Sequence, residues 1–424
     1  MWRNPLSSTD FVWAHIGIAA RGLDAPYVIE NSHRDSSAGR RAAVVGGSLA
    51  GLHAAALLRS DGWDVHVYER SAKLLDGAGA GIIAHPATLR FLTDVEGVPA
   101  SSICCRATAI RTYGADGASV AEPSRDYLTT SWTALYRSLL ASVGHDRYHL
   151  GHELVGIDPG PDSVSISFAS GHTTRADLVV GADGIASTAR RVLKAETTRE
   201  YSGYVGWRGI VDPGLLDPEV ASKLSQAISF GSSRDGHIVA YPIPKSGDSS
   251  QVMLNFVWYR NVAVGSEFDE LMTDAGGVRR DVSLHNPRPS ALAEMRASAE
   301  ELGPDLANLV ASTPKPFLQA VFDQFADQMA FGRIALIGDA ASVARPHAAA
   351  GTAKAAENGR MLAQALRESN GNVQAALSRW EPGQLELGQQ LIERSKALGE
   401  SAQAALTWPT RDPASEFGLY GPGR

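Results

Sequence analysis

The sequence is poor in cysteine, contains no dense cluster of basic residues and has no long apolar run. Its 424 residues include two cysteines, Cys104 and Cys105. Neighbouring cysteines rarely bridge each other, so we expect neither a disulfide framework nor a cysteine-based zinc site, and no other motif indicates a metal. This usage fits a reducing compartment, and we expect a cytoplasmic protein. No apolar run approaches the ~18–20 residues of a membrane-spanning helix, so no membrane partner is expected.

Charge and the start of the chain narrow the alternatives further. The formal net charge is −7, and the lysines and arginines are dispersed, which argues against a nucleic-acid groove. The apolar stretch 11–20 has the length of a signal-peptide core, but it contains His15 and directly follows Asp10. Because signal peptides have basic flanks, we interpret residues 1–39 as an N-terminal extension.

A dinucleotide-binding unit opens the main part of the chain. Residues 41–47 are an apolar run that ends in glycine, residues 49–60 have helical spacing, and residues 64–69 form a second short strand. Further strands are expected at 163–168 and 177–181. This order of strand, turn, helix and strand predicts an α/β fold with a Rossmann-like sheet.

The turn in this unit is imperfect but suited to phosphate. Against the pattern G-x-G-x-x-G, Gly46 permits a tight turn, Ser48 replaces the middle glycine, and Gly51 lets helix and strand pack closely. The helix N-terminus offers N–H groups to phosphate, and Glu69 can accept hydrogen bonds from a ribose. A glycine-rich turn without a ligand is the alternative, and the unit does not separate FAD from NAD. The candidate cofactor residues here are Gly46, Ser48, Leu49, Ala50, Gly51, Glu69 and Arg70.

Two further segments end a buried strand in a Gly/Asp turn. Residues 177–190 read DLVVGADGIASTAR, and residues 332–341 read GRIALIGDAA. Each turn places a carboxylate, of Asp183 or of Asp339, at the carboxyl end of a strand, where α/β sheets bind ligands. In this order, the three segments resemble the motifs of the single-component FAD-dependent aromatic hydroxylases, the family typified by para-hydroxybenzoate hydroxylase.

The resemblance implies an FAD enzyme that uses NADH or NADPH and O2. Oxygen activated at the C4a atom of the flavin would hydroxylate a small electron-rich aromatic or N-heteroaromatic ring, and the protein would position the ring and exclude water. Gly338 and Asp339 would hold the ribityl chain, and Asp183 the pyrophosphate side. The expected partners are a small aromatic substrate and O2, with no nucleic acid, and a homodimer is compatible with the sequence.

The resemblance also implies the domain order. We expect FAD-binding segments at 40–198 and 328–370, a β-sheet substrate domain at 199–327, and C-terminal helices and tail at 371–424. The C-terminal part is helical over roughly 353–405, with an interruption expected near Pro382.

The resemblance is most specific in the run from 345 to 357, which is closest to the branch that includes 2,6-dihydroxypyridine 3-hydroxylase. The common family pattern P-x-x-G-x-G-x-N is changed here by Ala349 and Ala353. Small residues let the backbone lie against a flavin ring, and the start of the following helix can stabilise negative charge on it. A simple Ala-rich helix start is the alternative. The candidate flavin contacts are Pro346, Ala350, Gly351 and Thr352.

Two departures leave contacts open. Many relatives have an arginine that braces the FAD at the position of Trp132, and a histidine at the position of Ser342. The candidate cofactor residues here are Trp132 itself and Arg137, one turn later, as a substitute for that arginine.

Candidate substrate residues come from the aromatic, β-rich part of the chain. Tyr204, Trp207, Arg208 and His237 are expected to bind the ring, although Trp207 and Arg208 also suit sheet packing and an internal ion pair. The candidate catalytic residues are His347, His85 and Tyr241, with His347 preferred; structural histidines are the alternative.

Three alternatives to a hydroxylase remain at this level. The first is an FAD reductase or dehydrogenase of the same fold without oxygenation, and the second is a ligand-sensing flavoprotein. The third, a flavin halogenase, is disfavoured because its W-x-W-x-I-P motif is absent.

Overall fold

The computed structural model describes residues 39–77, 79–114, 117–245, 248–403 and 416–424. The N-terminal extension expected at 1–39 therefore lies outside the described residues except for Gly39. Among the helices of the described part, none combines the length and apolar character that a bilayer crossing requires.

A six-stranded sheet is built from segments that are far apart in the chain. Its order is β17-β18-β10-β1-β2-β6, and all neighbours pair in parallel except β17 with β18. The strands are β1 (Arg41–Val45), β2 (Asp64–Tyr68), β6 (Tyr148–His149), β10 (Leu178–Gly181), β17 (Ala330–Phe331) and β18 (Ile334–Leu336). The carboxyl ends of β1, β10 and β18 therefore bring the three predicted motifs to one edge.

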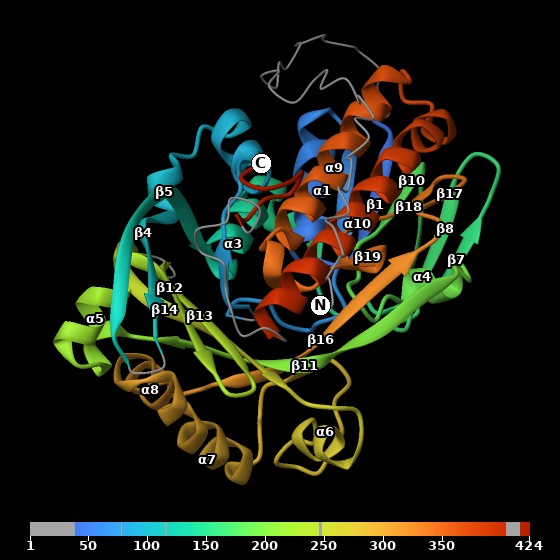
Figure 1. The fold of residues 1–424 in the computed structure, drawn as a ribbon. Helices are drawn as coiled ribbons and strands as arrows, with labels where there is room; N and C mark the ends of the chain where they lie inside the picture. The colour runs from blue at the N-terminus through green and yellow to red at the C-terminus, as the bar shows by residue number, and fades with distance from the viewer. Residues whose placement is uncertain (1–38, 78, 115–116, 246–247, 404–415) are drawn as a thin grey trace, which may run out of the picture. The chain divides into compact units, whose positions relative to one another are not determined.

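Helices cover this sheet. The helix α1 (Leu49–Ser60) packs against α3 (Trp132–Val143) and α9 (Gly351–Glu368), and α9 packs against α10 (Val373–Gln403). Figure 1 shows α1, α9 and α10 together beside β1, β10 and β18. A Cβ atom added at Gly359 would lie 3.2 Å from the backbone of Ala54, so a small residue is needed where α9 crosses α1.

A larger, ten-stranded sheet follows the order β15-β16-β11-β14-β13-β12-β4-β5-β3, with β19 beside β16. Its strands are β3 (Gly81–Ile83), β4 (Cys104–Tyr113), β5 (Ser119–Ser131), β11 (Thr197–Val211), β12 (Ala227–Ser233), β13 (Gly236–Lys245), β14 (Asp248–Asn261), β15 (Ser283–Leu284), β16 (Phe317–Ala326) and β19 (Ser342–Val343). One face packs on short helices through a core that contains Val205, Trp207, Phe256 and Trp258. The other face borders the cavity described below.

The long strand β11 is interrupted once. Its pairing with β16 changes register between Tyr201 and Val205, and Gly203 in this bulge has φ +84°. Beyond the bulge, alternate side chains point to opposite faces of the sheet. Val205 and Trp207 therefore enter the helix-covered core, whereas Gly206 and Arg208 line the cavity.

The remaining elements are short. A three-stranded sheet consists of β7 (Leu154–Pro159), β8 (Val164–Phe168) and β9 (Thr173–Ala176). The other helices are α2 (Pro86–Arg90), α4 (Thr188–Val192), α5 (Pro218–Leu224), α6 (Ser266–Leu271), α7 (Pro289–Ser298) and α8 (Pro304–Ala311). The turns of 3-10 or π type are 91–95, 100–102, 145–147, 213–215, 299–302, η6 (Gly338–Ala340) and η7 (Pro346–Ala348).

The expected helix interruption near Pro382 is wrong. The helix α10 runs through Pro382, and the break lies between α9 and α10, where Asn370 has φ +49° and Gly371 has φ +74°. Asn and Gly adopt this left-handed conformation most easily and commonly end helices, whereas a proline removes one helical hydrogen bond without always ending the helix.

Candidate active site

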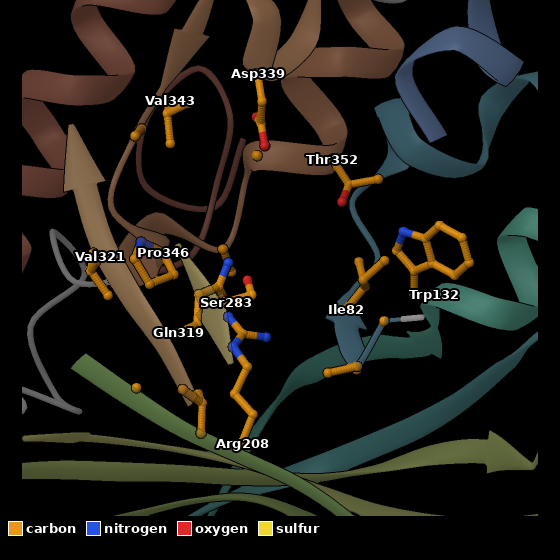
Figure 2. Close-up of a pocket in the computed structure, with 18 of the residues that line it drawn as sticks. Ile82, Trp132, Arg208, Ser283, Gln319, Val321, Asp339, Val343, Pro346 and Thr352 are labelled. Atoms are coloured by element: carbon orange, nitrogen blue, oxygen red, sulfur yellow. The ribbon is translucent and has the colours of Figure 1, made fainter. Parts of the chain in front are cut away.

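One cavity of about 460 Å³ lies between the carboxyl ends of the six-stranded sheet and the exposed face of the ten-stranded sheet. Figure 2 shows Asp339 and Thr352 on one side of it and Arg208 extending toward them from β11. Trp132 and Ile82 form one flank, and Pro346 and Val343 the other. The cavity thus meets both the predicted cofactor segments and the aromatic sheet.

The glycine-rich turn after β1 is packed too tightly for larger residues. A Cβ atom at Gly46, which has φ +104°, would lie 2.4 Å from the carbonyl oxygen of Ala182, and one at Gly51 would lie 1.9 Å from that of Gly46. The buried Glu69 accepts a hydrogen bond from the N–H of Gly47 at 2.9 Å. The turn is therefore held open toward the cavity, where Ser48, Leu49 and Ala50 line the wall.

Two helices begin at the cavity without a capping side chain. Neither Ser48, before α1, nor Ala350, before α9, caps its helix through a side chain. By contrast, α3 and α4 are capped by the hydroxyls of Ser131 and Ser187. A helix N-terminus without a cap leaves N–H groups and a positive dipole end for an anion. The two uncapped ends fit the phosphates and the flavin ring of FAD.

The turn after β18 carries Asp339 into the cavity above a buried lysine. The side chain of Asp339 is 55% exposed, and its carboxylate lies 4.0 Å from the ammonium of Lys354. That ammonium donates to the carbonyl oxygens of Gly338 and Ser342 and to the hydroxyl of Ser342. Burial lowers the pKa of Lys354 to about 8. The lysine thus fixes the turn that presents Asp339.

Asp183 does not line the cavity. Its carboxylate accepts from the hydroxyl of Ser187 and from the N–H groups of Thr188 and Ala189, so it holds the start of α4. The neighbours Ala182 and Gly184 line the cavity instead.

Arg137 and Arg70 also lie outside the cavity lining, as do Gly46, Gly51, Glu69 and Gly338, whereas Trp132 lines it. Arg137 forms a bidentate ion pair with Asp76, and Arg70 is exposed outside the cavity lining. Trp132 does line the cavity: its ring stacks on Tyr136, and a Cβ atom at Gly79 would lie 2.3 Å from it. The sequence reveals no partner for Arg137, because Asp76 lies in a loop far from it in the chain.

The backbone from Pro346 to Gly351 passes along the cavity. Ala349 has φ +54°, which is unusual for a residue with a Cβ atom. Its carbonyl oxygen accepts a hydrogen bond from Nε2 of the buried His85 at 3.1 Å. His85 does not line the cavity, so it supports the turn.

A cluster of rings surrounds His347. Its Nε2 lies 2.7 Å from the hydroxyl of Tyr204, and its ring centroid lies 5.4 Å from that of His237. Nδ1 of His237 donates to Oε1 of Gln403 at 2.5 Å. Burial holds the pKa of His347 well below its usual range and lowers the pKa of His237 to about 4. Both imidazoles are therefore neutral near pH 7.

The predicted substrate and catalytic residues divide between two faces of the sheet. Arg208, His237, Tyr241 and His347 line the cavity, Tyr204 lies behind His347, and Trp207 is a core residue on the opposite face. Within the described part of the chain, the side chain of Arg208 forms no hydrogen bond or ion pair, although its backbone pairs in the sheet. The internal ion pair considered for it is therefore absent there. Burial raises the pKa of Tyr241, so its hydroxyl stays protonated.

Sequence reasoning missed several residues of the site. Tyr259 lines the cavity from β14, Phe417 from the C-terminal tail, and Gln403 supports His237 from α10. Only Lys354 carried a signal, as a charged residue within an alanine-rich helix. No cluster that could hold a metal ion occurs among the residues that the structure describes.

Comparisons with known proteins decide the family. The chain is 39% identical over 383 residues to 2,6-dihydroxypyridine 3-monooxygenase from Paenarthrobacter nicotinovorans, covering 89% of this chain and 96% of that protein. The chain belongs to the FAD-dependent aromatic hydroxylases. This FAD-dependent hydroxylase also matches the solved 2,6-dihydroxypyridine-3-hydroxylase from Arthrobacter nicotinovorans, with 38% identity, a TM-score of 0.84 and coverage of 92% and 99% of the two chains.

Other relatives of the hydroxylase are more distant. It is 26% identical to 6-hydroxynicotinate 3-monooxygenase from Bordetella bronchiseptica, over 80% of this chain and 86% of that one. A family model described as FAD binding domain-like matches residues 201–323. The predicted FAD, monooxygenase class and α/β fold are thus confirmed.

Proposed function

We propose that this FAD-dependent monooxygenase hydroxylates a small N-heteroaromatic ring of the hydroxypyridine class. The observation that carries the proposal is the presence in one cavity of a cationic Arg208 without an ion-pair partner among the described residues and a neutral, buried His347. The relatives named for dihydroxypyridine and hydroxynicotinate substrates support the same class.

The reaction balances as ring C–H plus O2, NAD(P)H and a proton, giving ring C–OH, water and NAD(P)⁺. FAD, when bound, supplies the redox chemistry between the nicotinamide, O2 and the ring. We assign its phosphates to the start of α1, its ribityl chain to Asp339, and its flavin ring to the backbone of Pro346, Ala350, Gly351 and Thr352.

The side chains would activate the ring. A hydroxyl on a pyridine ring donates more electron density once it is deprotonated. Arg208 favours the anionic form by its charge, and the neutral His347 can hydrogen-bond the hydroxyl, with Tyr204 hydrogen-bonded behind it. The protonated hydroxyls of Tyr241 and Tyr259 can donate hydrogen bonds to ring oxygens. Apolar side chains, including Val239 and Val257, also line the cavity and would reduce the contact of the ring with water.

The test is a substrate screen with the FAD-loaded protein. Flavin reduction by NADH and by NADPH is followed anaerobically with hydroxypyridines, hydroxybenzoates and hydroxyquinolines. We expect a hydroxypyridine to accelerate reduction most and, in air, to yield a product that carries one atom from ¹⁸O2. Hydrogen peroxide without a hydroxylated product from any ring would overturn the proposal and favour an oxidase or reductase activity.

A further inference from the structure

The C-terminal residues 416–424 lie against the backbone that borders the flavin side of the cavity. The N–H of Gly418 donates to the carbonyl oxygen of Ala348 at 3.3 Å. Leu419, which is 4% exposed, packs in a cluster with Ala348 and Ala350. We call residues 416–424 the C-terminal strap.

Two side chains fix the strap to the helices. The guanidinium of Arg394, on α10, donates to the carbonyl oxygens of Gly418, at 2.6 Å, and Glu416. The hydroxyl of Tyr420 donates to the carboxylate of Glu357, on α9, at 2.6 Å. Because both helices are also anchored on the six-stranded sheet, the strap has a defined position relative to the cavity.

The strap delivers one aromatic ring to the cavity. Phe417 lines it, is 7% exposed and belongs to a cluster with Val239, Tyr241 and Tyr259 of the ten-stranded sheet. Its ring centroid lies 5.6 Å from that of Tyr127. Phe417 therefore contacts the same side of the cavity as the proposed substrate residues, at the opposite end of the chain from the dinucleotide turn.

We propose that Phe417 is a specificity-determining residue that limits the size of the substituents the ring may carry. This inference rests on the proposed function. Phe417 is packed against other rings, and the strap that carries it is held on both sides of this residue, by Arg394 at Glu416 and Gly418 and by Glu357 at Tyr420. The phenyl group therefore cannot withdraw with the strap unless these contacts break. A ring with an added alkyl group at this wall would clash with Phe417, and removing the phenyl group would make room for it.

The experiment compares two substrates in wild-type protein and in Phe417→Ala. The parent probe is the hydroxypyridine that the wild-type protein hydroxylates fastest, and the second probes are the same ring with an ethyl group at each free position. We expect the ratio of kcat/KM for the best ethyl-substituted ring to that for the parent to rise about tenfold or more, the scale of one or two methylene groups in an apolar pocket. The Kd of the ethyl-substituted ring, from perturbation of the flavin absorbance, should fall relative to the Kd of the parent ring. The bound FAD content should stay constant.

Further variants separate specificity from folding. Phe417→Leu keeps an apolar side chain and should give a smaller change in the same direction. Arg394→Met, which releases the strap, should also raise the ratio, whereas Arg379→Met on the exposed side of α10 should leave it unchanged. An unchanged ratio in folded Phe417→Ala or Phe417→Leu would overturn the inference while leaving the hydroxylase function intact. A wild-type protein that hydroxylates no ring in the panel would overturn both.

Discussion

Lys354 lies in surroundings that its type rarely occupies, because it is 1% exposed and lysines are almost never fully buried. Its ammonium compensates Asp339 and satisfies the carbonyl oxygens of Gly338 and Ser342. In Lys354→Met these acceptors lose their donor, at a cost of about 1–3 kcal/mol for each buried group left unpaired. We expect a lower melting temperature and an FAD Kd raised about tenfold or more, measured by fluorescence titration. Lys73→Met, at an exposed position, is the control, and an unchanged FAD Kd in Lys354→Met would remove the lysine from the cofactor site.

The buried histidines predict how stability depends on pH. Burial lowers the pKa of His85 and of His237 from 6.5 to about 4. Between these values the unfolded chain binds protons that the folded chain does not, so acidification favours unfolding. Each histidine then destabilises the fold by about 1.4 kcal/mol per pH unit below 6.5, until the folded form is itself protonated near pH 4. Unfolding free energies measured from pH 8 to pH 5 should fall below pH 6.5, and less steeply in His237→Gln; equal slopes for both proteins would contradict this.

Single residues also show what sequence reasoning could and could not reach. The positions of Ser48, Asp339, Arg208 and His347 at the cavity follow from motif order and from the resemblance. Asp183, Arg137 and Trp207 could not be placed in the same way, because a local cap, an ion pair with a distant loop and strand alternation decide where they point. Their neighbours in the fold, not in the chain, determine their environment.

At the scale of elements, the turn η7 holds Ala349 in a left-handed conformation that costs a residue with a Cβ atom about 1–2 kcal/mol. Ala349→Gly removes this strain but gives the unfolded chain more freedom, which costs about 0.4–1 kcal/mol. We expect a net stabilisation of about 0.5 kcal/mol by denaturant unfolding. The neighbouring Ala348→Gly, in the same turn but without positive φ, should destabilise. If Ala349→Gly destabilised the protein as much as Ala348→Gly does, the turn would be shown to be unstrained.

The uncapped start of α9 predicts that one substitution will stabilise the FAD-free protein and weaken its binding of FAD. A Cβ atom at Gly351 would meet nothing within 4 Å, so Gly351→Asp can be accommodated. A carboxylate at this helix end should stabilise the FAD-free protein by about 0.3–1 kcal/mol through the helix dipole. The same charge would repel the electron-rich side of the flavin and weaken FAD binding. Thermal unfolding without FAD and titration with FAD measure the two effects, with Gly351→Ala as the control. Stronger FAD binding by Gly351→Asp would refute the placement of the flavin ring.

On the scale of the whole molecule, the proposed FAD contacts come from the start of α1, the turn after β18 and the segment that leads into α9, so binding should stabilise elements that are far apart in the chain. A ligand that binds only the folded state adds about 4 kcal/mol at a free concentration of 1,000 times its Kd. We expect removal of FAD to lower the melting temperature by several degrees, and added FAD to restore it in a concentration-dependent way. A melting temperature that does not respond to FAD would place the cofactor outside these elements.

The fold could be predicted where sequence motifs mark its elements. It could not be predicted where a segment takes its position from contacts with residues far away in the chain. The parallel strands β1, β10 and β18 could be predicted because each ends in a Gly-containing turn. The strap could not, because residues 416–424 have no periodicity and acquire their position only through Arg394, Glu357 and Ala348. The misplaced helix break shows the same limit, since Pro382 is a local signal that the packing of α10 overrides.

The bulge in β11 bears on how chimeras of these enzymes can be built. Thr197–Tyr201 pairs only with β16, whereas the residues after Gly203 join both β14 and β16 in the sheet that borders the cavity. A substrate sheet transplanted from another member of the family would therefore impose its own pairing register on both neighbours of β11, the strands β14 and β16. Crossovers placed at Gly203 and at Val321, where pairing is already interrupted, would let donor and recipient strands meet without shifting every side chain to the wrong face.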